Sequence, residues 1–144
     1  MGLSVALELA RRGVEVELLD HPRPGRMATP AAAGMLSPLS ESSETGPFLE
    51  AGMDSLARYP AWVASLREAT GLDPWLRTDG KLRLARTPGE MRRLEALLER
   101  AREVASPARV LSPSEAREAA GVPLGPVEGA LLLERDYQVE NRRL

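Results

Sequence analysis

The chain has 144 residues, a formal net charge of −2 at pH 7, 43% hydrophobic and 28% charged residues, and no cysteine. This length is sufficient for a domain with a buried core, and the small net charge, with arginines interleaved among glutamates, gives no footprint for nucleic acid. The absence of cysteine excludes disulfides, thiolate metal sites and a cysteine nucleophile from these residues.

Residues 1–20 predict a helix, a glycine stop and a strand that ends in an acid. Apolar and small residues recur at helical spacing after Gly2, and Gly13 is the type of residue that ends a helix. Residues 14–19 then alternate between apolar and acidic side chains, which predicts a strand with one solvated face. Asp20 follows, where the carboxyl end of the strand is expected.

This order of elements is typical of the part of a dinucleotide-binding βαβ unit that comes after its first glycines. The spacing from Gly2 to Asp20 suits the last glycine of the fingerprint and the carboxylate that binds the adenosine ribose. The first strand and the first two glycines of that fingerprint are not in the sequence. An alternative remains open, namely any αβ unit whose strand happens to end in an aspartate.

The opening helix is not predicted to be a targeting or membrane segment. Glu8, Arg11 and Arg12 interrupt it, and no cleavage motif follows. No apolar stretch approaches the roughly twenty residues of a membrane span. We therefore expect a cytoplasmic protein that does not act at a membrane.

Residues 25–38 contain a run of small residues that suits an anionic ligand. The run at 31–34 allows backbone N–H groups to approach a phosphate, and Gly34 can adopt a positive φ. Arg26 offers planar donors to phosphate, and Thr29 can cap a short helical turn or donate its hydroxyl. Composition alone favours another interpretation, a small-residue helix packed in a core.

The remaining chain predicts scaffold elements. We expect a helix over 48–71 that Pro60 kinks or splits, then two short strands at 75–86 around the Asp79-Gly80 turn. Thr87-Pro88-Gly89-Glu90 and Ser112-Pro113-Ser114-Glu115 are capping boxes for helices to about 104 and 121. Residues 129–133 predict another strand.

Several motifs together resemble the glycine oxidase (ThiO-type) branch of the D-amino acid oxidase family of flavoproteins. The specific one is Ala-Ala-Ala-Gly-Met-Leu at 31–36, and supporting matches lie at 56–62, 80–85 and 136–144. In the last of these, Asn141 stands where the family usually has proline. The resemblance spans the chain but only about the first two-fifths of a family member.

The resemblance implies FAD as cofactor, with the 31–36 loop along the pyrophosphate and Met35 as a wall near the flavin ring. It implies that Asp20 binds the adenosine ribose and that His21 is a loop residue near the adenosine. With a single histidine, a histidine-rich metal site is excluded. The predicted cofactor-binding residues are Gly2, Asp20, His21, Arg26, Thr29, Ala32, Ala33, Gly34 and Met35.

The expected fold class is α/β, with an incomplete Rossmann-like FAD-binding part and the beginning of an α+β substrate domain. We place a partial FAD-binding domain at 1–72 and a partial substrate domain at 73–138. Residues 139–144 would begin a helix that returns to the FAD-binding domain.

By resemblance, a complete relative takes a hydride from the α-carbon of glycine or a similar small amine and releases an imine. Oxygen then reoxidises the flavin to give hydrogen peroxide, and the imine can feed thiamine thiazole synthesis. The arginine and tyrosine that bind the substrate lie in the later half of family members. No residue here inherits their roles, so we name no catalytic residue and expect this chain alone to be inactive.

Two hypotheses of different classes remain. In the first, the chain is a fragment of an enzyme, from a mis-called start, a frameshifted gene or a split protein. In the second, it is a stand-alone α/β module that binds a nucleotide or a protein without catalysis. In either case the unpaired edge of the strand predicted at 14–19 favours a homo-oligomer.

Overall fold

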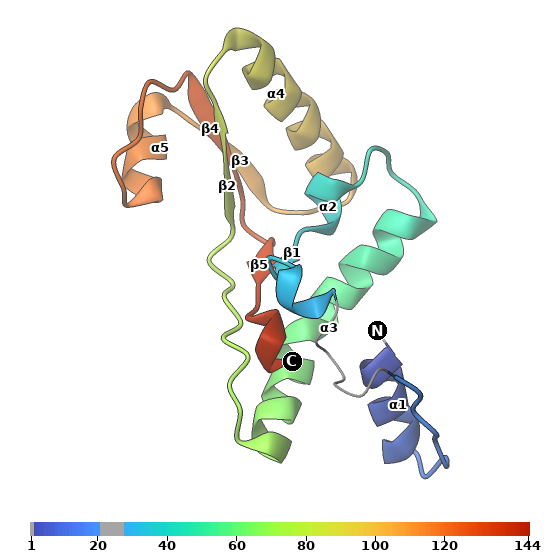
Figure 1. The fold of residues 1–144 in the computed structure, drawn as a ribbon. Coiled ribbons are helices and arrows are strands. Elements are labelled where there is room, and N and C mark those ends of the chain that lie inside the picture. Colours follow the sequence, from blue (N-terminus) through green and yellow to red (C-terminus); the bar gives the residue numbers. More distant parts are fainter. Residues whose placement is uncertain (1, 21–27) are drawn as a thin grey trace. The chain divides into compact units, whose positions relative to one another are not determined.

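The computed structural model describes residues 2–20 and 28–144. By contacts the chain divides into two units, residues 1–31 and residues 32–144. They are called here the first unit and the second unit, and each is described by itself (Figure 1).

The first unit contains helix α1, Gly2–Arg11, and the 3₁₀ turn η1, Thr29–Ala31. Gly13 adopts φ +76°, and its amide donates to the Ala10 carbonyl at 2.9 Å. The Val14 amide donates to the Leu9 carbonyl at 3.1 Å, which satisfies another carbonyl at the helix end. The predicted helix and its glycine stop are confirmed.

The strand predicted at 14–19 is not formed. Residues 14–20 carry no secondary structure, and no ladder partner for them exists in the described ranges 2–20 and 28–144. Alternating side chains provide one face of a strand, but a strand also needs a second backbone to complete its hydrogen bonds. The predicted strand with one solvated face is therefore wrong in pairing and in burial, because residues 14–19 are all exposed.

The second unit is built on a three-stranded antiparallel sheet with the order β2-β4-β3. The strands are β2, Lys81–Ala85, β3, Ala108–Leu111, and the central β4, Gly129–Leu133. A separate two-stranded ladder pairs β1, Met35–Leu36, with β5, Tyr137–Gln138, again antiparallel. Because β5 follows β4 after a short turn, the loop before β1 is tied to the sheet through β5 (Figure 1).

Helices lie on both faces of the sheet (Figure 1). Alternate residues of β4 serve the two faces, because Leu131 and Leu133 join one buried cluster and Ala130 joins the other. The first cluster includes residues of α2, Pro38–Glu41, of α3, Pro47–Thr70, and of α4, Pro88–Glu103. The second cluster includes Ala116 of α5, Pro113–Ala120. The 3₁₀ turn η2, Asn141–Arg143, comes last.

Most scaffold predictions for the second unit are confirmed. Both capping boxes are present, with Thr87 accepting from the Glu90 amide and Ser112 accepting from the Glu115 amide. The strand at 129–133 has the predicted bounds. Helix α3 continues through Pro60 as one helix, so the proline does not split it.

The hairpin predicted around Asp79-Gly80 is wrong. Strand β2 pairs with β4, and Arg77 instead forms a bridge with Gln138 of β5. The segments before and after Gly80 therefore both pair with residues 129–138, and they do not pair with each other. Gly80 adopts φ +87°, and an added Cβ there would lie 2.8 Å from the Leu133 carbonyl oxygen, so the glycine permits a close approach.

The mixture of helices and small sheets agrees with the α/β expectation. None of the helices in the described part of the chain is long and apolar enough to cross a membrane. The domain bounds placed above at 72 and 138 stay a prediction.

Candidate functional site

The predicted cofactor-binding residues fall in different parts of the chain. Gly2, Asp20 and Thr29 belong to the first unit, while four neighbours belong to the second unit, namely Ala32, Ala33, Gly34 and Met35. His21 and Arg26 lie outside the described residues. The structure therefore brings together only the loop 32–35, and cofactor binding by all nine residues stays a prediction.

Gly34 anchors this loop to β5. It adopts φ +70°, as predicted, and its carbonyl accepts a hydrogen bond from the Val139 amide at 2.9 Å. A Cβ at this position would lie 1.9 Å from the Val139 carbonyl oxygen, inside any allowed contact. Glycine is therefore required at this position for two reasons, its positive φ and the close approach of the segment at Val139.

The small residues before Gly34 are open to solvent. Ala32 and Ala33 are exposed, and the Ala33 carbonyl accepts from Gln138 Nε2 at 3.4 Å. Methyl side chains leave the backbone here accessible, which fits a ligand that bonds to backbone N–H groups, such as a phosphate. The alternative of a small-residue helix packed in a core is wrong for residues 32–34, which are neither helical nor buried.

Met35 opens the two-stranded ladder opposite Gln138 and is 56% exposed. It lines a cavity of about 240 Å³ between β1, β5 and the segment before β2. This volume accommodates a small molecule of amino-acid size and is below the usual range of drug-sized pockets, about 300–1,000 Å³. The other lining residues are Ser37, Arg77, Asp79, Gly80, Lys81, Tyr137 and Gln138.

A buried polar cluster adjoins this cavity. Asp136 is 4% exposed and accepts a hydrogen bond from Ser40 Oγ at 3.3 Å. Lys81 Nζ donates to the same Ser40 Oγ at 2.9 Å and lies 3.6 Å from the exposed Glu41 carboxylate. The hydroxyl of Ser40 thus lies between an ammonium and a carboxylate, which suits its capacity to accept and donate at once.

Burial raises the pKa of the Asp136 carboxyl above its ordinary value, and nearby Ser37, Lys81, Ser40 and Arg83 oppose that rise. The Ser37 hydroxyl is itself buried and meets hydrogen-bond geometry with no described residue, although it lies close enough to the carboxylate to lower its pKa. A buried acid whose hydrogen bond from Ser40 spans 3.3 Å is expensive to ionise, which agrees with the raised pKa of Asp136.

Sequence reasoning did not identify this cluster as functional. Its hydrogen bonds join residues 96 and 41 positions apart, which no local pattern encodes. The only available signal was Asp136 itself, the first residue of the motif at 136–144.

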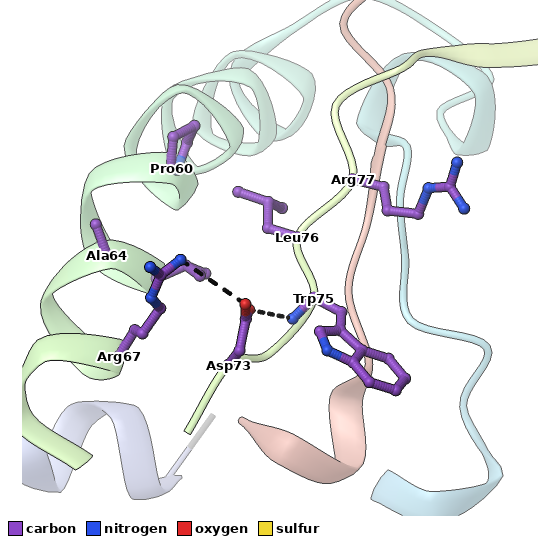
Figure 2. Close-up of a pocket in the computed structure, with 8 residues that line it drawn as sticks. Pro60, Ala64, Arg67, Asp73, Trp75, Leu76 and Arg77 are labelled. Atoms are coloured by element: carbon purple, nitrogen blue, oxygen red, sulfur yellow. Dashed lines mark hydrogen bonds and ion pairs between the residues drawn. The ribbon is translucent and has the colours of Figure 1, made fainter. Parts of the chain in front are cut away.

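A second cavity, of about 560 Å³, lies between α3 and the segment 73–77 (Figure 2). Arg67 and Asp73 form an ion pair at 3.7 Å across one side of it, and Asp73 Oδ1 accepts from the Trp75 amide at 2.8 Å. That turn holds Trp75 at φ +52°, unusual for a bulky residue. Leu76 points toward α3, while Trp75 and Arg77 point away from it (Figure 2).

Neither cavity holds a recognisable metal centre. Among residues 2–20 and 28–144, no group of three or more histidines, aspartates or glutamates is placed to hold a metal ion.

Comparison with known proteins gives a consistent result along the chain. The family described as FAD dependent oxidoreductase (DAO) matches residues 1–144. Glycine oxidase of Geobacillus kaustophilus is 35% identical over 118 residues, which is 82% of this chain and 31% of that protein. The bifunctional protein ThiO/ThiG of Synechocystis is 34% identical over 73 residues, 51% of this chain and 11% of that protein.

Solved structures agree. The crystal structure of the Geobacillus kaustophilus glycine oxidase matches 99% of this chain with a TM-score of 0.92 and 32% identity, and the match covers 38% of that chain. An iminodiacetate oxidase from Chelativorans matches 96% of this chain with a TM-score of 0.78 and 25% identity, again over 38% of its own chain. The 144 residues thus span about a third of the curated glycine oxidase they match and 38% of these two solved chains.

Proposed function

This chain belongs to the family of FAD-dependent oxidoreductases, and from that premise we propose that it forms part of an oxidase acting on glycine or a similar small amine. The products would be an imine and hydrogen peroxide. The proposal extends to thiamine thiazole synthesis as the use of that imine, because ThiO/ThiG proteins are among the relatives.

The loop 32–35 is the observation that carries this proposal. It presents an open backbone of small residues, it is fixed by the contact of Gly34 with Val139, and it ends at Met35 beside a cavity of about 240 Å³. A fixed and accessible backbone is what a cofactor pyrophosphate requires, and a small cavity next to it suits a small substrate.

In this proposal the chain supplies binding and position. The backbone of Ala32, Ala33 and Gly34 lies along the cofactor pyrophosphate, and Met35 forms an apolar wall. Asp20 binds the ribose hydroxyls with its two carboxylate oxygens. When bound, FAD supplies the hydride acceptor and passes the electrons to oxygen. No residue of this chain is proposed to act as acid, base or nucleophile.

The first unit would contribute through the start of α1, where Gly2 allows close approach of a phosphate and the helix N-terminus favours negative charge. Thr29 would donate its hydroxyl, and Arg26 and His21 would lie near the phosphate and adenosine. These four assignments rest on the resemblance to the family.

The alternative of a stand-alone module without catalysis is not favoured. It explains neither the family match over residues 1–144 nor the structural match of 99% of the chain to a glycine oxidase. This alternative predicts that the chain binds a nucleotide and that no amine is oxidised, even when the chain is combined with the remaining part of a family member.

Titration of FAD against the purified chain tests the proposal, with flavin fluorescence as the measurement. We expect weak binding by the wild type and a dissociation constant about tenfold higher for Asp20→Ala, since a lost charged hydrogen bond weakens binding by about that factor. Glu17→Ala, an exposed acid three residues earlier, is the control and should bind as the wild type. Equal affinity of Asp20→Ala and wild type would remove Asp20 from the site. Weak or absent binding is expected of these 144 residues alone, so the same pair of variants is also compared within a full-length glycine oxidase chimera that carries residues 1–144, where no binding would overturn the cofactor assignment.

A further inference from the structure

The ladder of β1 and β5 is fixed at both of its ends. At one end the Val139 amide donates to the Gly34 carbonyl, directly beyond the pair Met35–Gln138. At the other end Asp136, the residue before β5, accepts from Ser40 of α2, beyond the pair Leu36–Tyr137. Two contacts therefore hold the ladder that follows the loop 32–35. One is the backbone hydrogen bond between Val139 and Gly34, and the other is the side-chain hydrogen bond between Ser40 and Asp136.

In the side-chain contact, the acceptor is the carboxylate of Asp136, although the neutral amide of an asparagine would fit the same space. Asp136 lies buried at 4% exposure, and Lys81 reaches it through the Ser40 hydroxyl. Glu41 lies on the outer side of Lys81, and Arg83 is the other cation whose charge acts on Asp136. Ser37, which follows β1, lies against the same carboxylate. Side chains from three segments thus surround the Asp136 carboxylate. These segments are the one that follows β1, the start of β2 and the turn before β5.

A neutral side chain of the same shape is expected to stabilise the fold at least as well as the ionised Asp136 carboxylate. An acid whose pKa is raised in the folded state favours folding when it is protonated, and that contribution is lost as the pH rises through the folded pKa. For Asp136 the raised pKa comes first from burial, so above that pKa the ionised carboxylate opposes folding relative to a neutral side chain of the same shape. Residues that lower stability in this way concentrate at functional sites.

We propose that Asp136 is a positioning residue that acts through Ser40 and Lys81 to hold β1, and with it the loop 32–35, in a single arrangement beside the 240 Å³ cavity. The inference rests on the proposed function, in which that loop faces FAD. Asp136 itself touches neither cofactor nor substrate in this proposal. The Ser40 hydroxyl accepts from Lys81 Nζ at 2.9 Å and donates to Asp136 at 3.3 Å, so it connects the ammonium to the carboxylate.

Asp136→Asn in the full chain separates position from stability. The amide can still accept from Ser40, so the shape of the cluster remains while the charge is lost. We expect hydrogen exchange at the Val139 amide to become roughly five to ten times faster, the factor that separates a charged from a neutral hydrogen bond. The urea midpoint of unfolding at pH 7 should be equal to that of the wild type or higher. Glu134→Gln, an exposed acid in the turn before β5, is the matched control and should change neither measurement.

Ser40→Ala provides the second variant. This substitution removes the hydroxyl between Lys81 and Asp136 and keeps both of their charges, so hydrogen exchange at the Val139 amide should again be faster. The urea midpoint should fall at pH 7, because the Asp136 carboxylate loses its hydrogen bond, and it should recover as Asp136 is protonated. Unchanged exchange in both variants would overturn the proposal. So would a loss of stability in Asp136→Asn that matches the faster exchange, because that result describes an ordinary structural contact.

The exchange measurement needs no ligand, which keeps this inference distinguishable from the proposed function. Whether or not the 144 residues alone bind FAD, the exchange result decides the role of Asp136. If FAD binds, its dissociation constant should rise in Asp136→Asn and stay unchanged in Glu134→Gln.

Discussion

At the scale of single residues, Gly34 leaves the least room for a Cβ among the glycines of the described residues. Gly34→Ala combines a strained backbone angle with a Cβ only 1.9 Å from the Val139 carbonyl oxygen. Either the ladder of β1 and β5 opens or the chain stores the strain, so we expect a loss of about 3 kcal/mol in the free energy of unfolding. Urea unfolding followed by circular dichroism measures it.

Gly125→Ala is the control for this substitution. Gly125 has an ordinary backbone angle and no atom within 4 Å of an added Cβ, so its replacement should leave stability unchanged or slightly raise it. If Gly34→Ala is as stable as the wild type and keeps slow exchange at Val139, the contact described here does not exist in solution.

At the scale of elements, the two capping boxes fix where α4 and α5 begin. Thr87→Ala and Ser112→Ala should each lower the free energy of unfolding by about 1 kcal/mol, because each removes an acceptor from an otherwise unpaired helix amide. Thr87→Ser and Ser112→Thr keep the acceptor and should stay near the wild type. A loss of equal size in these conservative variants would show that packing, and not capping, is being measured.

The acids of the same boxes predict the pH dependence of this effect. Hydrogen bonds from the backbone of Arg86 lower the pKa of Glu90, and the Ser112 hydroxyl lowers the pKa of Glu115. An acid with a lowered folded pKa stabilises the fold above its unfolded pKa, and that stability is lost as the pH falls through the folded pKa. The stability difference between wild type and Glu90→Gln or Glu115→Gln should therefore shrink on acidification below about pH 4, in the opposite sense to Asp136.

The contrast between elements predicted correctly and wrongly has a physical basis. The capping boxes and the Gly13 stop depend on neighbours within a few residues, and the sequence was sufficient to predict them. The strand at 129–133 was predicted from its continuous apolar run, although its partners, β2 and β3, lie far away in the sequence. The hairpin at Asp79-Gly80 and the strand at 14–19 depend on which backbone completes the hydrogen bonds. In the structure β2 and Arg77 pair with residues 129–138, which lie far away in the sequence, and no local pattern encodes that pairing.

The candidate site follows the same division. The loop 32–35 was predicted from small residues and a specific motif, and the positive φ of Gly34 followed from its residue type. The partner that makes Gly34 necessary, Val139, lies 105 residues away and was visible only in the structure. The cluster of Asp136, Ser40 and Lys81 was invisible for the same reason.

At the scale of the whole molecule, the first unit leaves apolar side chains exposed. Leu3, Val5, Val14, Leu18 and Leu19 are all exposed, Leu19 at 85%. We retain the prediction of a homo-oligomer that covers this surface, although the strand on which it was based is not formed. Sedimentation of the purified chain should give a dimer or larger species, and Leu18→Lys should shift it toward monomer. Val122→Lys, at an exposed site of the second unit, should not. A monomer at all concentrations contradicts the prediction.

The polypeptide of residues 1–144 is expected to leave peroxide production at background with FAD and glycine, sarcosine or D-amino acids. Hydride transfer depends on a substrate held in near-attack geometry, and such positioning contributes up to about 7–11 kcal/mol of the barrier. By family resemblance the residues that hold the substrate carboxylate belong to a region that this polypeptide does not contain. Its own cavity beside Met35 offers Lys81 and Arg77, but Lys81 lies 3.6 Å from the Glu41 carboxylate and Arg77 is paired with Asp79 at 2.8 Å. Their charges are therefore already compensated.

A chimera tests this reasoning in the direction of gained activity. Residues 32–144 should replace the matching segment of the Geobacillus kaustophilus glycine oxidase, because that segment is the part of the fold best described here. If the chain supplies position and the cofactor supplies chemistry, the chimera oxidises glycine, and Gly34→Ala within it lowers turnover together with FAD affinity. Turnover by the 144-residue polypeptide alone would show instead that a residue interpreted here as scaffold takes part in the reaction, and Lys81→Met would be the first substitution to identify it.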